Sequence, residues 1–252
     1  MLAILLLSLC HNLKAESAFS LDLKTDIALG SLAVGLFVGS WLLENPPNQM
    51  PCSLSQSDVN AFDRLFMVPG FNPAIANIAT ATMVGMVGLS PVLPLLGNFS
   101  LNTAVTYGVM YSQAFLLTFA TRNLIKNNLP RFRPYAYDGR DPHYLESYDH
   151  SSFPSGSTSM AFLAATFAGT TFSREHPNSR WRLPVVIGSY ALAAGVGIMR
   201  MASGQHFITD VFAGAAIGSF YGWIIPFLHR NVAVNSFAIR YAGNGLSVSF
   251  RL

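Results

Sequence analysis

The chain has 252 residues, of which 51% are hydrophobic and only 11% are charged, whereas an average soluble domain carries about 25% charged residues. This shortage of charge favours a membrane protein. The formal net charge of +3 is small and the basic residues are dispersed, which excludes a nucleic-acid groove.

Residues 1–26 are interpreted as an N-terminal extension or an atypical export signal. Residues 1–9 are apolar and Ala15 is a candidate cleavage position, but the basic leader of an ordinary signal is missing. Whether residues 1–15 are removed stays open. The two cysteines, Cys10 and Cys52, match no metal or redox motif, so no disulfide framework is expected.

Six apolar runs within residues 27–230 predict an all-α, six-helix bundle that spans a membrane. At about 1.5 Å per residue, most of them can cross a hydrocarbon core of about 30 Å. Pro91 and Pro94 are expected to kink the end of the second run, and Gly214 and Gly218 allow close helix approach in the sixth. The alternative is a soluble helical core. The runs cover residues 27–43, 75–96, 103–124, 157–172, 183–199 and 207–228.

Three polar segments interrupt or follow these runs. Residues 44–70 predict a loop or surface helix, with Phe62 to Arg64 lying along the membrane surface. The longest polar insertion is 126–153. In the tail, 231–252, alternating apolar residues around a Gly-Asn-Gly turn predict a short β-hairpin.

Two groups of polar residues at predicted helix ends suit an anion. Lys126 and Arg133 lie seven residues apart and could grip a phosphate from two sides, although basic residues are also common at helix ends. Ser155 and Gly156 open the fourth helix, where free N–H groups favour an anion. The same two residues also make an ordinary helix cap.

A third group consists of Arg200, His206 and Asp210. The step of four residues predicts that the imidazole and the carboxylate share one helix face. Asp210 would then keep one ring nitrogen protonated and leave the other free to attack, while Arg200 clamps an anion. Taken alone, the pair is more typical of a histidine that caps a helix and pairs with an aspartate. Because six helices alternate in direction, all three groups emerge on one side of the membrane.

This set of motifs resembles the type-2 phosphatidic acid phosphatase and vanadium haloperoxidase superfamily. The family signature is Lys-x6-Arg-Pro, then Pro-Ser-Gly-His, then Ser-Arg-x5-His-x3-Asp, and the match extends over residues 103–230. The resemblance implies hydrolysis of a lipid phosphate monoester or diphosphate through a phosphohistidine, without metal or cofactor. His206 would be the nucleophile and Asp210 its orienting carboxylate. The implied phosphate-binding residues are Lys126, Arg133, Ser155, Gly156, Ser157 and Arg200.

Two positions depart from the signature. Met199 replaces a serine, and Ser157 stands where the family has its second histidine, the general acid. A serine hydroxyl is too weak an acid for that role, which is typically worth ~10²- to 10⁴-fold in rate. Three outcomes remain open. The enzyme uses good leaving groups such as pyrophosphates or acyl phosphates; another acid acts, with His150 better placed than His143; or the protein binds phospholipid without turnover.

The distribution of basic residues predicts the orientation. Once the phosphate-binding and neighbouring basic residues are set aside, the side opposite the motifs carries more of them than the motif side, where Arg64, Arg122 and Arg140 remain. The positive-inside rule then puts the site on the periplasmic or external face of the inner membrane. A cleaved signal would invert this topology, and a soluble periplasmic acid phosphatase is a further alternative. The expected partners are a phospholipid or isoprenyl phosphate and membrane lipid; the oligomeric state stays open. The residues on the opposite side are Lys14, Lys24, Arg174, Arg180, Arg182 and Arg230.

Overall fold

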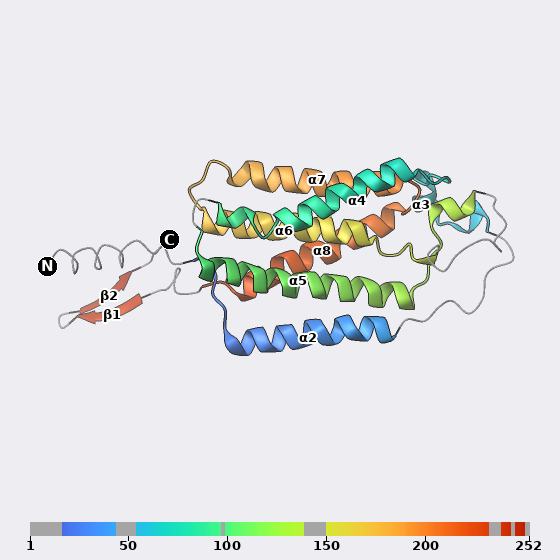
Figure 1. Ribbon diagram of the computed structural model, residues 1–252. Coiled ribbons are helices and arrows are strands. Elements are labelled where there is room, and N and C mark those ends of the chain that lie inside the picture. Colours follow the sequence, from blue (N-terminus) through green and yellow to red (C-terminus); the bar gives the residue numbers. More distant parts are fainter. Residues whose placement is uncertain are drawn as a thin grey trace.

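The computed structural model describes residues 17–43, 54–96, 99–138 and 150–231, and the backbone of two strands beyond them. The predictions for residues 1–16, for Cys52 and for His143 lie outside this part. Six long helices lie side by side along one axis (Figure 1), and a short helix, α3, lies near one end of them. The α-helices are α2 (Leu23–Leu42), α3 (Ala61–Leu65), α4 (Pro73–Leu89), α5 (Leu101–Asn128), α6 (Gly156–Glu175), α7 (Arg182–Ala202) and α8 (Ile208–Leu228).

Shorter elements complete the fold. Among the described residues, 3-10 turns occur at η1 (Gln56–Asp58), η2 (Leu93–Leu95) and η3 (Pro134–Tyr137). Within the predicted hairpin segment, strands β1 (Ala238–Ala242) and β2 (Gly245–Ser249) pair antiparallel.

All six predicted helices are present, with shifted ends. α4 stops at Leu89 and the chain continues through Pro91 into η2, so the predicted proline kink is confirmed. α5 begins at an N-cap, Ser100, whose side chain accepts the N–H of Thr103, and it ends only at Asn128. Lys126 therefore lies in the last turn of a helix and not in the polar segment that follows.

Four of the six predicted spans are long and apolar enough to cross a membrane: α2, residues 73–95 including η2, α7 and α8. α5 and α6 do not reach that apolarity, so the prediction of six apolar spans was too simple. The reason lies in the packing, because α6 is surrounded by α4, α5, α7 and α8. A helix enclosed by helices needs small and hydroxyl side chains that fit its neighbours more than it needs lipid-facing ones.

The closest helix contact is the seam between α6 and α8. Gly214, Gly218 and Gly222 recur every four residues on α8 and all are buried. A Cβ at Gly218 would lie 2.0 Å from the carbonyl oxygen of Ser159 and 2.7 Å from the backbone nitrogen of Leu163. The small-residue spacing in the sixth run thus lets the two backbones touch.

A polar link attaches α2 at the end of the bundle opposite the motifs. The Asp26 carboxylate accepts a hydrogen bond from Gln113 Nε2 of α5 at 2.9 Å and lies 2.8 Å from His229 Nε2, just after α8. Phe19 bridges Arg230 in an antiparallel arrangement. The first and last described segments of the bundle are therefore joined to each other.

Replacing Gly218 by Ala should destabilise the bundle. Its methyl group overlaps the α6 backbone, which cannot move aside as a flexible side chain would, and overpacking of this kind costs about 1–3 kcal/mol. Thermal unfolding in detergent measures the effect. Gly188→Ala on α7, where an added Cβ meets nothing within 4 Å, is the matched control and should leave the Tm unchanged or raise it. Equal Tm values for the two variants would contradict the tight seam.

Candidate active site

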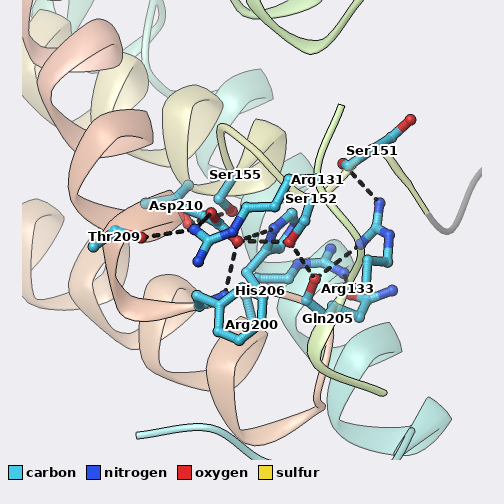
Figure 2. Close-up of polar contacts among 12 residues, drawn as sticks. Arg131, Arg133, Ser151, Ser152, Ser155, Arg200, Gln205, His206, Thr209 and Asp210 are labelled. Carbon is cyan, nitrogen blue, oxygen red and sulfur yellow. Dashed lines mark hydrogen bonds and ion pairs between the residues drawn. The ribbon is translucent and has the colours of Figure 1, made fainter. Parts of the chain in front are cut away.

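Three chain segments meet at one end of the bundle (Figure 2). The segment after α5 runs beside the segment before α6, because Arg131 N–H donates to His150 O at 2.7 Å and Ser152 N–H donates to Arg131 O at 3.0 Å. The start of α6 is tied to α8, since Ser155 N–H donates to Asp210 O at 3.0 Å. The structure thus brings the three groups of motif residues together, with backbone hydrogen bonds between their loops.

His206 and Asp210 face each other at the start of α8. Their side chains are 4% and 0% exposed, and His206 Nδ1 lies 3.6 Å from Asp210 Oδ2. This distance is longer than a hydrogen bond, and catalytic hydrogen bonds are often long in structures without a substrate. His206 lies in the α7–α8 link and Asp210 in the first turn of α8. The two side chains therefore meet across the helix start, and the expectation that they share one helix face was wrong.

The Asp210 carboxylate is held from several directions. Oδ2 accepts hydrogen bonds from Ser152 Oγ at 2.6 Å and from the Phe207 N–H at 2.8 Å, and Oδ1 accepts one from Arg131 Nη1 at 2.6 Å. Every one of these partners is a donor, which requires an acceptor-only, ionised carboxylate. The carboxylate that faces His206 is therefore fixed in place by the protein itself.

Asp63 in α3 belongs to the same network, although the sequence suggested a membrane-surface position for it. It is fully buried. Oδ2 accepts a hydrogen bond from Arg131 Nη2 at 2.5 Å, and Oδ1 accepts the Thr209 N–H at 3.0 Å. Burial alone would raise the pKa of Asp63, but hydrogen bonds from Arg131, Asn60 and Thr209 outweigh it and lower the pKa. Arg131 thus bridges Asp63 and Asp210.

Sequence reasoning missed Asp63 and Arg131 as parts of the site. Arg131 lies inside the Lys-x6-Arg spacing, so the sequence does not distinguish it from the basic residues of the motif. Asp63 lies far from Arg131 in the chain, so the sequence does not suggest that the two are paired. The available signal was an acidic residue within the otherwise mainly apolar sequence of residues 59–70.

The cations of the signature converge on the carbonyls around His206. Arg133 donates to Gln205 O at 3.2 Å and to Ser151 O at 3.3 Å, and Lys126 Nζ also donates to Ser151 O. Arg200 donates to the side chains of Gln205 and Thr80. Arg133 and Arg200 are 2% and 5% exposed. Buried guanidinium groups held only by neutral oxygens in these contacts suit an incoming anion.

The first turn of α6 supplies the second motif. Ser155 is its buried N-cap residue, but its hydroxyl shares a hydrogen bond with Thr158 Oγ1 at 2.8 Å and does not cap the helix. Gly156 touches an arginine that the sequence did not single out: a Cβ there would lie 2.1 Å from Arg122 Nη1. Ser157 follows and is half-buried. Backbone N–H groups at such a helix start favour an anion.

His150, the candidate replacement acid, is buried next to the segment that follows α5. Its ring packs against the ring of Phe132 with 4.7 Å between centroids, and its carbonyl accepts the Arg131 N–H. It directly precedes Ser151, whose carbonyl receives Lys126 and Arg133. His150 therefore belongs to the wall of the site through its backbone, and its acid role stays a prediction.

The electrostatics suit a neutral, nucleophilic imidazole. Burial lowers the pKa of His206 far below its ordinary value, and the charges of Arg133 and Lys126 lower it further, against the opposing effect of Asp210. At neutral pH the ring therefore keeps a lone pair on one nitrogen. Among the described residues, no group of three or more His, Cys, Asp or Glu side chains is arranged to hold a metal ion.

Replacing Asp63 by Asn should destabilise the site in a pH-dependent way. Because the pKa of Asp63 is lowered in the fold, its contribution is present above the unfolded value of about 3.9 and is lost as the pH falls through the folded value. Losing a charged hydrogen-bond acceptor should cost about 2 kcal/mol at neutral pH. Thermal unfolding in detergent at a series of pH values measures this.

The matched control is Asp58→Asn on the exposed turn η1, which should have little effect. A Tm difference between wild type and Asp63→Asn that stays the same at acidic pH would contradict the ionised Asp63–Arg131 pair.

Comparisons with known proteins agree with this geometry. The model of the PAP2 superfamily matches residues 107–233. A lipid A 1-phosphatase of Porphyromonas gingivalis is 32% identical over 85 residues, which are 32% of this chain and 18% of that protein. A PA-phosphatase related-family protein of Dictyostelium discoideum is 30% identical over 129 residues, which are 47% of each chain. The chain thus spans less than half the length of these relatives.

Among solved structures, a transmembrane PAP2-type phosphatidylglycerolphosphate phosphatase from Bacillus subtilis is similar, with 22% identity and a TM-score of 0.41 over 79% of this chain and 96% of that one. The family match covers half of the chain and includes α6, α7, α8 and every motif residue from Lys126 to Asp210. The chain therefore belongs to the PAP2 superfamily.

Proposed function

We propose that this protein is a membrane phosphatase that hydrolyses a phosphate monoester or diphosphate of a lipid through a phosphohistidine. The observation that carries the proposal is the pairing of His206 Nδ1 with the fixed Asp210 carboxylate, 3.6 Å away, among buried cations. This pairing leaves Nε2 as the attacking nitrogen. Phosphoryl transfer depends mainly on positioning and charge stabilisation, and the surroundings of His206 supply both.

In this proposal each cation has a role set by its position. Lys126 and Arg133 approach the phosphate from the end of α5 and the loop after it, and Arg200 approaches from the end of α7. The N–H groups at the start of α6 complete the cradle. Together they neutralise the three equatorial oxygens of the phosphoryl group as it moves to His206.

The lipid substrate follows from the surface of the bundle. Large apolar side chains on the candidate spans are exposed, among them Leu183 at 66%, Ile198 at 65% and Phe212 at 59%. Such a surface is costly in water and natural in a bilayer, which argues against the soluble periplasmic alternative. A substrate anchored in the same bilayer would present its headgroup at the end of the helices, where the motifs lie.

The orientation proposal rests on charge. Lys24, Arg174, Arg182 and Arg230 lie at the helix ends opposite the motifs. The positive-inside rule then favours a cytoplasmic location for that end and a periplasmic or external location for the active site.

Purified protein in detergent should release phosphate from at least one of phosphatidate, phosphatidylglycerophosphate, lipid A 1-phosphate or an isoprenyl diphosphate. His206→Ala should lose at least about 10³-fold in kcat, because it removes the proposed nucleophile. Trapping of radiolabelled phosphate on wild-type protein, but not on His206→Ala, checks the intermediate directly. Wild-type protein that binds vanadate yet hydrolyses none of these lipids would favour the silent, phospholipid-binding alternative, which Ser157 supports.

Restoring the histidine of the family signature at position 157 tests which residue gives a proton to the leaving group. Ser157→His should raise kcat on a lipid phosphate monoester by about 10²-fold if the missing general acid limits the rate. The companion variant is His150→Ala. An unchanged rate in Ser157→His together with a collapse in His150→Ala would assign the acid to His150 and contradict a missing acid.

A further inference from the structure

The chain between η1 and α4 presents a surface that the proposed chemistry does not explain. Residues 61–71 contain the short helix α3 and its link to α4, and we call them the α3 segment. Its exposed large apolar residues are Phe62, Leu65, Phe66, Val68 and Phe71, of which Leu65 is 78% exposed. Asp63, by contrast, is fully buried. One short segment thus combines a buried acid with an exposed apolar surface.

Two attachments hold the α3 segment at the active-site end of the bundle. Within α3, Asp63 Oδ2 accepts hydrogen bonds from Arg131 Nη2 at 2.5 Å and from Thr209 Oγ1 at 2.7 Å. At the end of the segment, the Asn72 N–H donates to Ser203 O at 3.2 Å, in the link between α7 and α8. The apolar surface therefore has a fixed place beside the site.

The position of the α3 segment in the chain sets its depth relative to a membrane. α4 begins at Pro73, and residues 73–95 are long and apolar enough to cross a membrane. The segment ends immediately before this span, and α3 lies near the end of the long helices where α4 begins (Figure 1). It is therefore at the level where a span leaves the hydrocarbon core and meets the lipid headgroups.

Lipid is the covering that this surface fits. A contiguous apolar patch is costly in water, and segments with Phe and Leu on one face lie at the boundary between headgroups and acyl chains. The surface continues onto α4, where Ile78 and Val84 are 56% and 58% exposed. Arg64, the other charged residue of the segment, is exposed and suits the phosphate of a headgroup.

The inner side of the α3 segment reaches the active site through one arginine. Arg131 Nη1 donates to Asp210 Oδ1 at 2.6 Å (Figure 2), while Nη2 of the same guanidinium donates to Asp63. The guanidinium carbon lies 4.1 Å from the centroid of the Phe207 ring. Because a guanidinium is a rigid planar fork, a displacement of Asp63 tilts the donor that holds Asp210.

We propose that the α3 segment lies in the bilayer surface next to the active site, and that this contact holds Asp210 in place through Asp63 and Arg131. Asp63 is then a positioning residue, which acts on His206 through two other side chains and does not touch the substrate. The effect on catalysis rests on the proposed phosphatase function, whereas the contact with the bilayer does not.

A fluorescent NBD label on Leu65→Cys tests the contact, in the full-length chain with Cys10→Ser and Cys52→Ser. In phosphatidylcholine vesicles, lipid that carries a nitroxide near its headgroup should quench most of the emission of this label, and aqueous iodide should quench little. The matched control is a label on Ser57→Cys in the exposed turn η1, for which the two quenchers should act in the reverse order.

Two results would overturn the bilayer contact. Quenching of the label at position 65 by iodide and not by lipid would show that the segment is in water. Quenching by neither would show that a protein surface, such as a second copy of this chain, covers it.

The effect on catalysis is measured in the same vesicles, with the lipid that wild type hydrolyses fastest. Leu65→Gln combined with Phe66→Gln should lower kcat by about 10²-fold with little change in KM, the loss expected when a catalytic group shifts by about 1 Å. The matched control is Leu96→Gln combined with Phe99→Gln, exposed residues at the opposite end of the bundle, which should leave kcat unchanged.

A double-mutant cycle identifies the route of this effect. Adding Asp63→Asn to the Leu65→Gln and Phe66→Gln variant should lower kcat no further than Asp63→Asn alone, because both changes act on the same contact. Thermal unfolding confirms that each variant is folded at the assay temperature. Losses that multiply, or a loss confined to KM, would overturn the coupling. Phosphate release from none of the lipids would overturn the phosphatase function and the coupling together, and the quenching would still decide the contact.

Discussion

The buried carboxylate of Asp210 is the constraint on which the site depends. An ionised carboxylate with no exposed surface must have its lone pairs satisfied, and the partners come from different parts of the chain: Arg131 after α5, Ser152 before α6 and the Phe207 N–H at the start of α8. Arg131 extends the network to Asp63 in α3. Satisfying one charge thus ties together the segments that carry the signature residues.

The helices supply the frame that makes this arrangement possible. α6 lies at the centre with neighbours on every side, and the glycines of α8 let its backbone contact that of α6. This contact places the first turn of α6 directly against the first turn of α8, where Ser155 N–H meets Asp210 O. The same enclosure explains why α6 is rich in small and hydroxyl residues and is less apolar than the outer helices.

The two halves of the proposed chemistry differ in how completely the site provides for them. For attack, His206 has a fixed carboxylate facing Nδ1, and the charges of Arg133 and Lys126 act on its ring. For departure of the leaving group, the position that holds the general acid in the family signature is Ser157, whose hydroxyl is too weak an acid for that role.

The sequence by itself determined the six long helices, the proline break after α4, the glycine seam and the motif residues, because these follow from local hydropathy, backbone restriction and spacing. It did not determine that Asp63 is buried, that His206 lies in the link before α8, or that Arg122 covers Gly156. Each of these depends on contacts between segments far apart in the chain, and a charged residue looks the same in a sequence whether water or a buried partner satisfies it. Only the tertiary structure decided which arginine meets which carboxylate, because helix packing sets those distances.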